Sequence, residues 1–175
     1  MEEPKKQLPK IKIIGYLGNS TIEEIKSSII QQNQWITNDD KYNIVHIYKW
    51  KNKNASTIYM ECSPSLYHKI MKYGKLYVEW ERYPAYEVID VTRCYNCQEY
   101  YHKSKNCTKA KACEYCAEEH SEENCEKRQK KCKSCENANF RYKKNYNTEH
   151  TASDPVCPSK NYYMEVLKSK IDYGF

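Results

Sequence analysis

Short runs of β-branched and aromatic residues recur along the first part of the chain. They occupy residues 10–16, 42–50 and 57–62. Such runs are typical of strands, and the first of them, KIKIIGY, has the alternation of a half-buried strand. A fourth run, Lys75–Arg82, alternates Leu76, Val78 and Trp80 with polar residues. We expect it to form one strand with these three side chains pointing inward.

The segment between the first two runs has the period of an amphipathic helix. Ile22, Ile25 and Ile29 fall on one face at helical spacing. Ser20 and Glu23 precede this face in the S-x-x-E pattern of a capping box, which predicts that the helix begins there.

A second helix is predicted after the third run. Ser63-Pro64 is a typical opening, Leu66 and Ile70 share one side, and Gly74 is a typical stop. Residues 10–92 therefore have the order β-α-β-β-α-β. This order is the split βαβ arrangement and is similar to that of an RNA-recognition motif.

The resemblance to an RNA-recognition motif does not extend to its binding residues. That motif stacks bases on aromatic residues of its first and third strands, whereas Lys12 stands at the first of these positions. The segment KNASTIYM, residues 53–60, lacks the motif's glycine and its stacking pair. We expect residues 10–92 to contact protein or to self-associate, and not to bind RNA through the sheet.

The apolar pattern ends after residue 92. Residues 93–160 contain no Leu, Ile, Met or Trp, and their only large aliphatic or Phe residues are Phe140 and Val156. Little apolar area is available to offset chain entropy, so another interaction must order this segment. Apolar residues at helical spacing return in residues 161–175, which predicts a short C-terminal helix. They are Tyr163, Val166, Leu167 and Ile171.

Cysteine and histidine supply that interaction. Nine of the ten cysteines lie between Cys94 and Cys157, and with three histidines they divide in chain order into three sets of three cysteines and one histidine. Cys62 stands apart, in a predicted strand, as a small buried hydrophobe. The first set is Cys94, Cys97, His102 and Cys107; the second is Cys113, Cys116, His120 and Cys125; the third is Cys132, Cys135, His150 and Cys157.

The spacing of each set is that of a structural zinc site. A C-x2-C pair directs two thiolates at one ion from a tight turn, and a short spacer returns a histidine and a third cysteine. Zinc binding contributes roughly 10–16 kcal/mol in small metal-folded peptides, enough to order a segment of this size. We therefore expect three Zn²⁺ ions. For the third set, whose spacer is fourteen residues long, the alternative is an incomplete or redox pair of Cys132 and Cys135 with a solvated His150.

The remainder of the chain favours reduced thiols over disulfides. The first ten residues, MEEPKKQLPK, are charged where a secretory signal would be apolar, and no run is long and apolar enough to span a membrane. We expect a cytosolic or nuclear protein, and clustered cysteines in those compartments more often bind metal.

The first set resembles a known zinc-binding module. CYNCQEYYHKSKNC, residues 94–107, is similar to the CCHC zinc knuckle of retroviral and retrotransposon Gag proteins. The tandem of three resembles the Gag-like nucleic-acid-binding proteins of jockey-type non-LTR retrotransposons. WERYPAYEVIDVTRCYNCQ, residues 80–98, and HTASDPVCPSK, residues 150–160, are similar to further segments of those proteins.

This resemblance implies an α+β fold. An RRM-like βαββαβ domain over residues 10–92 would precede an irregular, zinc-stabilised array of three knuckles at 93–111, 112–126 and 127–160. Knuckles of this family usually carry glycine at three positions where this chain has Gln98, Tyr101 and Ala117. Because glycine permits positive φ, these substitutions raise the question of whether the tight loops form.

The resemblance also implies single-stranded nucleic-acid binding. Knuckles stack an unpaired base on an aromatic side chain while basic residues hold the phosphates. Tyr95 matches the family's aromatic position, with a lid over the thiolates as its alternative role, and Tyr100 and Tyr101 add stacking surface. The basic residues expected to take part are Arg93, Lys103, Lys105, Lys109, Lys111, Lys127, Arg128, Lys130, Lys131, Arg141, Lys143 and Lys144.

Charge is distributed unevenly over the three knuckles. Residues 93–111 carry +4, residues 112–126 carry −6 and residues 127–160 carry +6. Three zinc ions bound by nine thiolates would lower the net charge of the chain from +6 to about +3. The acidic second knuckle would repel phosphate, so we expect it to act as a spacer or to bind protein. KRQKK, residues 127–131, has a solvated linker or a nuclear import signal as its alternatives.

The leading hypothesis is a Gag-like protein that binds single-stranded RNA, and also DNA, packages element RNA into a ribonucleoprotein and acts as an annealing chaperone. The second is a zinc-scaffolded adaptor that binds proteins. A zinc enzyme is disfavoured because catalytic zinc keeps an open position for water, whereas each set here supplies four protein ligands. The chain also has no HExxH and no zinc deaminase pattern.

Overall fold

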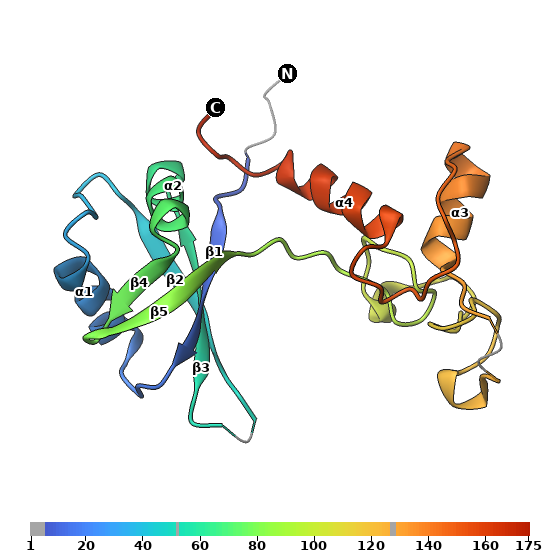
Figure 1. The fold of residues 1–175 in the computed structure, drawn as a ribbon, viewed down its shortest axis with the longest axis horizontal. Helices are drawn as coiled ribbons and strands as arrows, with labels where there is room; N and C mark the ends of the chain where they lie inside the picture. The colour runs from blue at the N-terminus through green and yellow to red at the C-terminus, as the bar shows by residue number, and fades with distance from the viewer. Residues whose placement is uncertain (1–5, 52, 127–128) are drawn as a thin grey trace. The chain divides into compact units, whose positions relative to one another are not determined.

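The computed structural model describes residues 6–51, 53–126 and 129–175 (Figure 1). It divides into two compact units. One unit contains the chain as far as Ile89 together with Ser169–Phe175, and the other is Asp90–Lys168. Within the described residues, no helix is both long and apolar enough to cross a lipid bilayer.

The first unit is a five-stranded antiparallel sheet with two helices (Figure 1). The strand order is β2-β3-β1-β5-β4. The protein is thus of mixed α+β class, as predicted. The strands are β1 (Lys10–Tyr16), β2 (Tyr42–Lys49), β3 (Ser56–Cys62), β4 (Lys75–Val78) and β5 (Glu81–Glu87), and the helices are α1 (Ile22–Gln32) and α2 (Pro64–Tyr73).

The start of α1 lies one residue later than predicted. Thr21 is the N-cap: its Oγ1 accepts the Glu24 N–H at 3.3 Å, and Glu24 Oε2 accepts the Thr21 N–H at 2.7 Å. The sequence STIEE contains this capping box and the predicted Ser20–Glu23 pair in adjacent registers. Ile25 and Ile29 are fully buried, whereas Ile22 is exposed.

The prediction of a single strand over Lys75–Arg82 is wrong. The chain reverses at Glu79 and Trp80, with φ of 50° and 72°, and forms a hairpin of β4 and β5. Two side chains of α1 hold this turn: Ser28 Oγ accepts the Glu79 N–H at 2.6 Å, and Gln32 Oε1 accepts the Trp80 N–H at 2.8 Å. Trp80 was expected to point inward, but it is 86% exposed at the tip of the hairpin.

The core of this unit lies between the sheet and the two helices. Ile11, Ile13, Leu66 and Ile70 are fully buried in it. Cys62 belongs to the same core, and its burial raises the pKa of the thiol to about 12. It is therefore a protonated packing residue, as the sequence predicted.

The C-terminal helix differs from its predicted bounds. It is α4 (Pro158–Lys168), which begins and ends earlier than predicted. Ile171 does not belong to it but forms a parallel bridge with Gln7. Two backbone hydrogen bonds hold this crossing, from the Gln7 N–H to the Lys170 carbonyl at 2.9 Å and from the Asp172 N–H to the Gln7 carbonyl at 2.8 Å. The last seven residues therefore belong to the first unit.

The second unit is less irregular than predicted. Besides α4 it contains the 3-10 turns η1 (Ser104–Asn106) and η2 (Glu122–Asn124) and the helix α3 (Lys133–Tyr142). The sequence KSCENANFRY of α3 has no Gly or Pro, and Arg141 lies in its last turn, where a cation favours a helix. The long spacer of the third cysteine set is thus helical in its first part.

Candidate metal centres

The second unit gathers the predicted ligands into three Cys/His clusters. Within each cluster the sulfur and imidazole nitrogen atoms all lie within 4.8 Å of one another. None of the ten cysteines is in a disulfide. The first cluster is Cys94, Cys97, His102 and Cys107; the second is Cys113, Cys116, His120 and Cys125; the third is Cys132, Cys135, His150 and Cys157. The division in chain order that the sequence predicted is the one that the fold produces.

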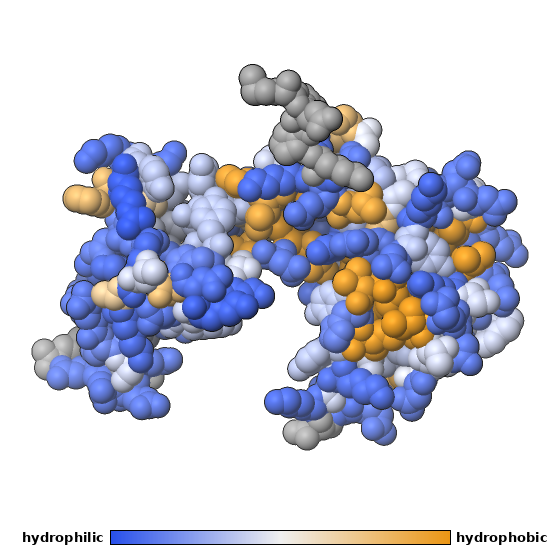
Figure 2. Space-filling view, turned by 180° about the vertical axis from the view of Figure 1, so that it is seen from behind, coloured by the Kyte–Doolittle hydropathy of each residue, from blue (hydrophilic) through white to orange (hydrophobic). Residues whose placement is uncertain are grey.

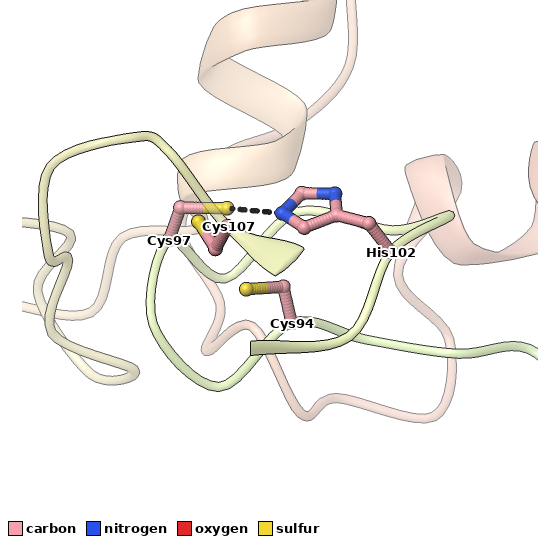
Figure 3. A group of neighbouring side chains, drawn as sticks. All are labelled: Cys94, Cys97, His102 and Cys107. Atoms are coloured by element: carbon pink, nitrogen blue, oxygen red, sulfur yellow. Dashed lines mark hydrogen bonds between the residues drawn. The ribbon is translucent and has the colours of Figure 1, made fainter. Parts of the chain in front are cut away.

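A tight turn builds the first cluster (Figure 3). The Gln98 N–H donates to the Cys94 carbonyl at 2.9 Å, and the Cys94 N–H donates to the Glu99 carbonyl at 2.7 Å. These bonds direct Cys94 and Cys97 to the same point. The chain then folds back so that His102 Nε2 lies 3.3 Å from Cys97 Sγ (Figure 3). Cys107 directly follows η1 and completes the cluster.

The second cluster repeats this local structure. The Ala117 N–H donates to the Cys113 carbonyl at 3.1 Å, and η2 delivers Cys125 as η1 delivers Cys107. Cys116 Sγ lies 3.1 Å from His120 Nε2 and 3.7 Å from Cys125 Sγ. Similar spacing in the sequence therefore produces the same turn twice.

The tight turns form without their glycines. Gln98, Tyr101 and Ala117 have φ of 61°, 84° and 67°, in the region that glycine adopts most readily. Each such residue costs of order 1–2 kcal/mol. Gln98 offsets the cost through its side chain, because Nε2 donates to two backbone carbonyls and Oε1 accepts from Arg93 Nη1 at 2.9 Å. These hydrogen bonds form only in the folded turn, so the sequence alone does not reveal them.

Two helix ends build the third cluster. Cys132 is the N-cap of α3, Cys135 lies in its first turn, and Cys157 immediately precedes α4. Cys135 Sγ is 3.5 Å from Cys157 Sγ and 3.6 Å from His150 Nε2. All three cysteines are buried, and His150 lies with them. The alternative of an incomplete pair with a separate histidine is therefore not the arrangement that forms.

The clusters fit a tetrahedral zinc ion. With Zn–S bonds of about 2.3 Å, two thiolates on one ion lie about 3.8 Å apart. The sulfur pairs at 3.5–3.7 Å and the sulfur–nitrogen pairs at 3.1–3.6 Å are close to this geometry. Three thiols and one imidazole are a typical structural zinc donor set, and four protein ligands leave no position for water.

The surroundings favour thiolate at particular positions. Asn96 Nδ2 donates to Cys107 Sγ at 3.3 Å, and this hydrogen bond lowers the pKa of the Cys107 thiol to about 6. The same amide nitrogen donates to the Lys109 carbonyl at 2.8 Å, which fixes its orientation. Burial raises the pKa of Cys97 to about 12. Asn96 thus belongs to the candidate site, although its spacing from Cys107 gives no recognisable signal in the sequence.

Four of the predicted phosphate-binding residues form ion pairs with glutamates. Glu99 pairs with both Lys109 and Arg141, joining the first cluster to α3. Glu136 pairs with Lys131 at 2.5 Å, and Glu114 pairs with Arg93 at 3.2 Å. Lys127 and Arg128 lie outside the described residues. Six exposed lysines form no ion pair with another described residue: Lys103, Lys105, Lys111, Lys130, Lys143 and Lys144.

The three predicted stacking tyrosines have different environments. Tyr95 is 72% exposed, too open to act as a lid over the thiolates, and the Arg93 guanidinium lies 5.1 Å from its ring centroid. Tyr101 is half exposed. Tyr100 is only 4% exposed because it packs against the third cluster and donates a hydrogen bond to the Ala152 carbonyl at 3.3 Å. Its predicted role in stacking is therefore wrong.

The surface around the second cluster is acidic. Glu118, Glu119, Glu122 and Glu123 are all exposed. Figure 2 shows mainly hydrophilic residues over the visible face of the second unit. A pocket of ≈ 620 Å³ is lined by Tyr95 and Lys111 and also by Glu122 and Glu123, so its lining carries both signs of charge.

The chain was compared with family models, with curated proteins and with solved structures, and none of them matches it. The functional assignment therefore depends on the three Cys/His clusters and on the side chains around them.

Proposed function

We propose that each Cys/His cluster holds one Zn²⁺ ion and that the zinc-ordered unit binds single-stranded nucleic acid. The observation that supports this most directly is the surface of the first cluster. Tyr95 presents an exposed ring there, and its backbone N–H donates to Ser104 Oγ in η1 at 2.9 Å. The exposed Lys103 and Lys105 flank Ser104. A stacking platform and two cations thus lie on two segments that this hydrogen bond joins.

Zinc would replace the missing hydrophobic core. The buried cluster of the second unit consists of Tyr100 and the three cysteines of the third Cys/His cluster, with Val91, Tyr146 and Tyr163 packed against it. This apolar area is small for about eighty residues, and metal binding would supply the remaining free energy of folding. The ions would act as structure-forming groups, with no part in chemistry.

Chelation tests the scaffold role of zinc. The tryptophans serve as an internal control, because all three lie in the first unit, which holds none of the three clusters. Trp35, Trp50 and Trp80 belong to the first unit. Exhaustive chelation should reduce the helical circular dichroism signal, as α3 and α4 are lost, and leave tryptophan emission unchanged. An unchanged dichroism spectrum after complete zinc removal would contradict the scaffold role.

Binding would combine stacking with phosphate neutralisation. An unpaired base stacked on Tyr95 contributes roughly 1–3 kcal/mol, and every base has a π-face, so preference among sequences would be weak. Lys103 and Lys105 would neutralise the phosphates on either side. The strand would avoid the exposed glutamates of the second cluster.

Three features support the finer assignment to a Gag-like knuckle protein. Two of the clusters have a C-x2-C turn followed by a short return, and the third has the six-residue spacing from His150 to Cys157 on which the resemblance rests. The order β2-β3-β1-β5, extended by β4, is compatible with the split βαβ arrangement expected upstream. In this proposal the protein packages element RNA and anneals strands in the cytoplasm or nucleus.

A filter-binding titration with single-stranded RNA at two salt concentrations tests the proposal. Tyr95→Ala should weaken binding about tenfold, and Lys103→Gln with Lys105→Gln should also flatten its salt dependence. Tyr48→Ala and Lys72→Gln, at exposed positions of the first unit, are the matched controls. Wild-type protein that fails to bind RNA, or equal loss in both controls, would contradict the proposal.

The acidic second cluster supports an adaptor role as the alternative. Glu118, Glu119, Glu122 and Glu123 form an exposed anionic surface that suits a basic protein segment better than a phosphate chain. Two results together would favour this alternative. The wild type would bind a polylysine peptide but no RNA, and a variant with all four glutamates changed to Gln would lose binding to the peptide.

A further inference from the structure

Five tyrosines line a pocket that lies apart from the exposed surface of the first cluster. The pocket has a volume of ≈ 400 Å³, within the range of about 300–1,000 Å³ typical of small-ligand sites. It is formed by α3, α4, the segment that follows α3, and Tyr101, which directly precedes His102 of the first cluster. Its principal lining residues are Tyr101, Tyr142, Tyr146, Tyr162, Tyr163 and Lys144.

The rings are arranged to leave aromatic surface open. Tyr163 meets Tyr101 and Tyr162 edge to face, with ring centroids 3.9 Å and 5.6 Å away and interplanar angles of 72° and 60°. Tyr101 and Tyr162 remain 53% and 50% exposed, and Tyr142 is 64% exposed. Each edge-to-face contact places the edge of one ring on the face of the other, and the exposed fractions show that ring surface remains available to a flat ligand.

The backbone holds this arrangement in place before any ligand binds. Lys143 ends α3 with φ of 53°, which turns the chain back. Asn139 then clamps Tyr146 in both directions: its Oδ1 accepts the Tyr146 N–H at 2.8 Å, and its Nδ2 donates to the Tyr146 carbonyl at 2.9 Å. A pocket whose wall is already ordered loses less entropy on binding.

The charge of the pocket selects its class of ligand. Lys144 Nζ lies 5.8 Å from the centroid of the Tyr162 ring, and no lining residue carries a carboxylate. An aromatic site can also hold a quaternary ammonium group, but here the protein's own ammonium takes that position and would repel a second cation. An aromatic ligand that carries an anionic phosphate satisfies both the rings and Lys144.

We propose that this tyrosine pocket binds one unpaired nucleobase of a single-stranded nucleic acid, with Lys144 contacting an adjacent phosphate. The inference deepens the proposed function and rests on it, since it adds a second base site to the one at Tyr95. The two sites would grip different nucleotides of one strand.

Paired substitutions on α3 and α4 test the pocket. Tyr162→Ala should weaken binding of a single-stranded RNA oligonucleotide about tenfold, as loss of one base stack predicts, whereas Tyr162→Phe should keep near wild-type affinity. Phe140→Ala is the matched control, because Phe140 is an exposed ring on α3 that does not line the pocket. Unchanged affinity in Tyr162→Ala protein with unchanged zinc content would overturn the proposal.

Photo-crosslinking to RNA that contains 5-bromouridine separates this proposal from the proposed function. Crosslinks at both Tyr95 and Tyr162 or Tyr142 would support two base sites. Crosslinks at Tyr95 alone would overturn the pocket and leave the proposed function intact. Wild-type protein that binds no RNA would overturn both proposals. If a trimethyllysine peptide binds saturably and Tyr162→Ala abolishes that binding, the ligand of the pocket is a cation and the nucleobase proposal is overturned.

Discussion

Arg93 and Glu114 form an ion pair that joins the first Cys/His cluster to the second. Arg93 Nη2 lies 3.2 Å from Glu114 Oε2, and Nη1 of the same guanidinium donates to Gln98 Oε1 at 2.9 Å. The guanidinium also packs over the Tyr95 ring. Arg93 thus links two clusters and supports the exposed tyrosine, so its charge is already compensated within the protein.

The Arg93–Glu114 pair predicts that Arg93 contributes little to phosphate binding. Lys105→Gln should lower the slope of log affinity against log salt by about 0.7, the value for one phosphate contact on a single strand. Arg93→Gln should leave the slope unchanged, because its partner in the protein is Glu114. A filter-binding salt titration of both variants measures this. A slope reduced equally by Arg93→Gln would contradict the structural role of the pair.

Gln98 and Ala117 occupy equivalent left-handed positions but differ in what their side chains do. Gln98→Gly relieves backbone strain yet removes three hydrogen bonds, so the zinc-loaded protein should lose about 1–2 kcal/mol of stability. Ala117→Gly removes only a methyl group. The relief of backbone strain and the added conformational entropy of the unfolded chain should nearly cancel, so stability should change little. Urea unfolding followed by circular dichroism gives both values. Stabilisation by Gln98→Gly would show that its side chain does not compensate for the strain.

Asn96 is predicted to tighten metal binding at the first cluster. Its amide donates to Cys107 Sγ at 3.3 Å, a contact that favours thiolate. Hydrogen bonds of this kind to metal ligands typically change affinity by about 10–100-fold. Asn96→Ala should therefore release the first zinc ion at a lower chelator concentration, by about tenfold, in a competition titration. The second and third ions serve as internal controls, and their equal loss would point to general unfolding instead.

Asp40 is predicted to make the first unit sensitive to acid. Burial raises the pKa of this carboxyl, but hydrogen bonds from Lys69, the Thr37 backbone and Ser65 outweigh burial and lower it to about 2. Since the unfolded value is about 3.9, the stabilisation of ~2 kcal/mol is complete above about pH 5 and disappears as the pH falls toward 2.

The Asp40→Asn variant provides the control for this pH dependence. It should be less stable than the wild type at pH 7, and the difference should shrink as the pH falls below 4. Tryptophan emission during urea unfolding reports on this unit alone. A stability difference that stays constant from pH 7 to pH 3 would contradict the assignment to Asp40.

The sequence predicted best the features that depend on local spacing. The ligands of the first two clusters are close in the chain, and the turn between two cysteines determines where their thiols point, so counting residues was sufficient. The first three strands and the second helix were likewise specified by local patterns. The helix register was harder, because Ser20–Glu23 and Thr21–Glu24 are both capping boxes by pattern.

The failures arose where distant residues decide the outcome. The reversal at Glu79 and Trp80 has no glycine and is held by side chains of α1, about fifty positions earlier in the chain. Tyr100 looks like a surface residue beside its cluster, but the third cluster covers it. Arg93 was predicted to bind phosphate because the sequence does not show that Glu114 lies next to it.

Zinc content per chain tests the three-cluster assignment directly. Atomic emission on protein purified without added metal or chelator should give three zinc ions per chain, because each cluster supplies three thiols and one imidazole within 4.8 Å of one another. The Cys132→Ser, Cys135→Ser double variant should give two. A wild-type ratio of two would contradict the assignment of three sites. A ratio well below two would contradict the metal scaffold, and with it the binding surface proposed on the first cluster.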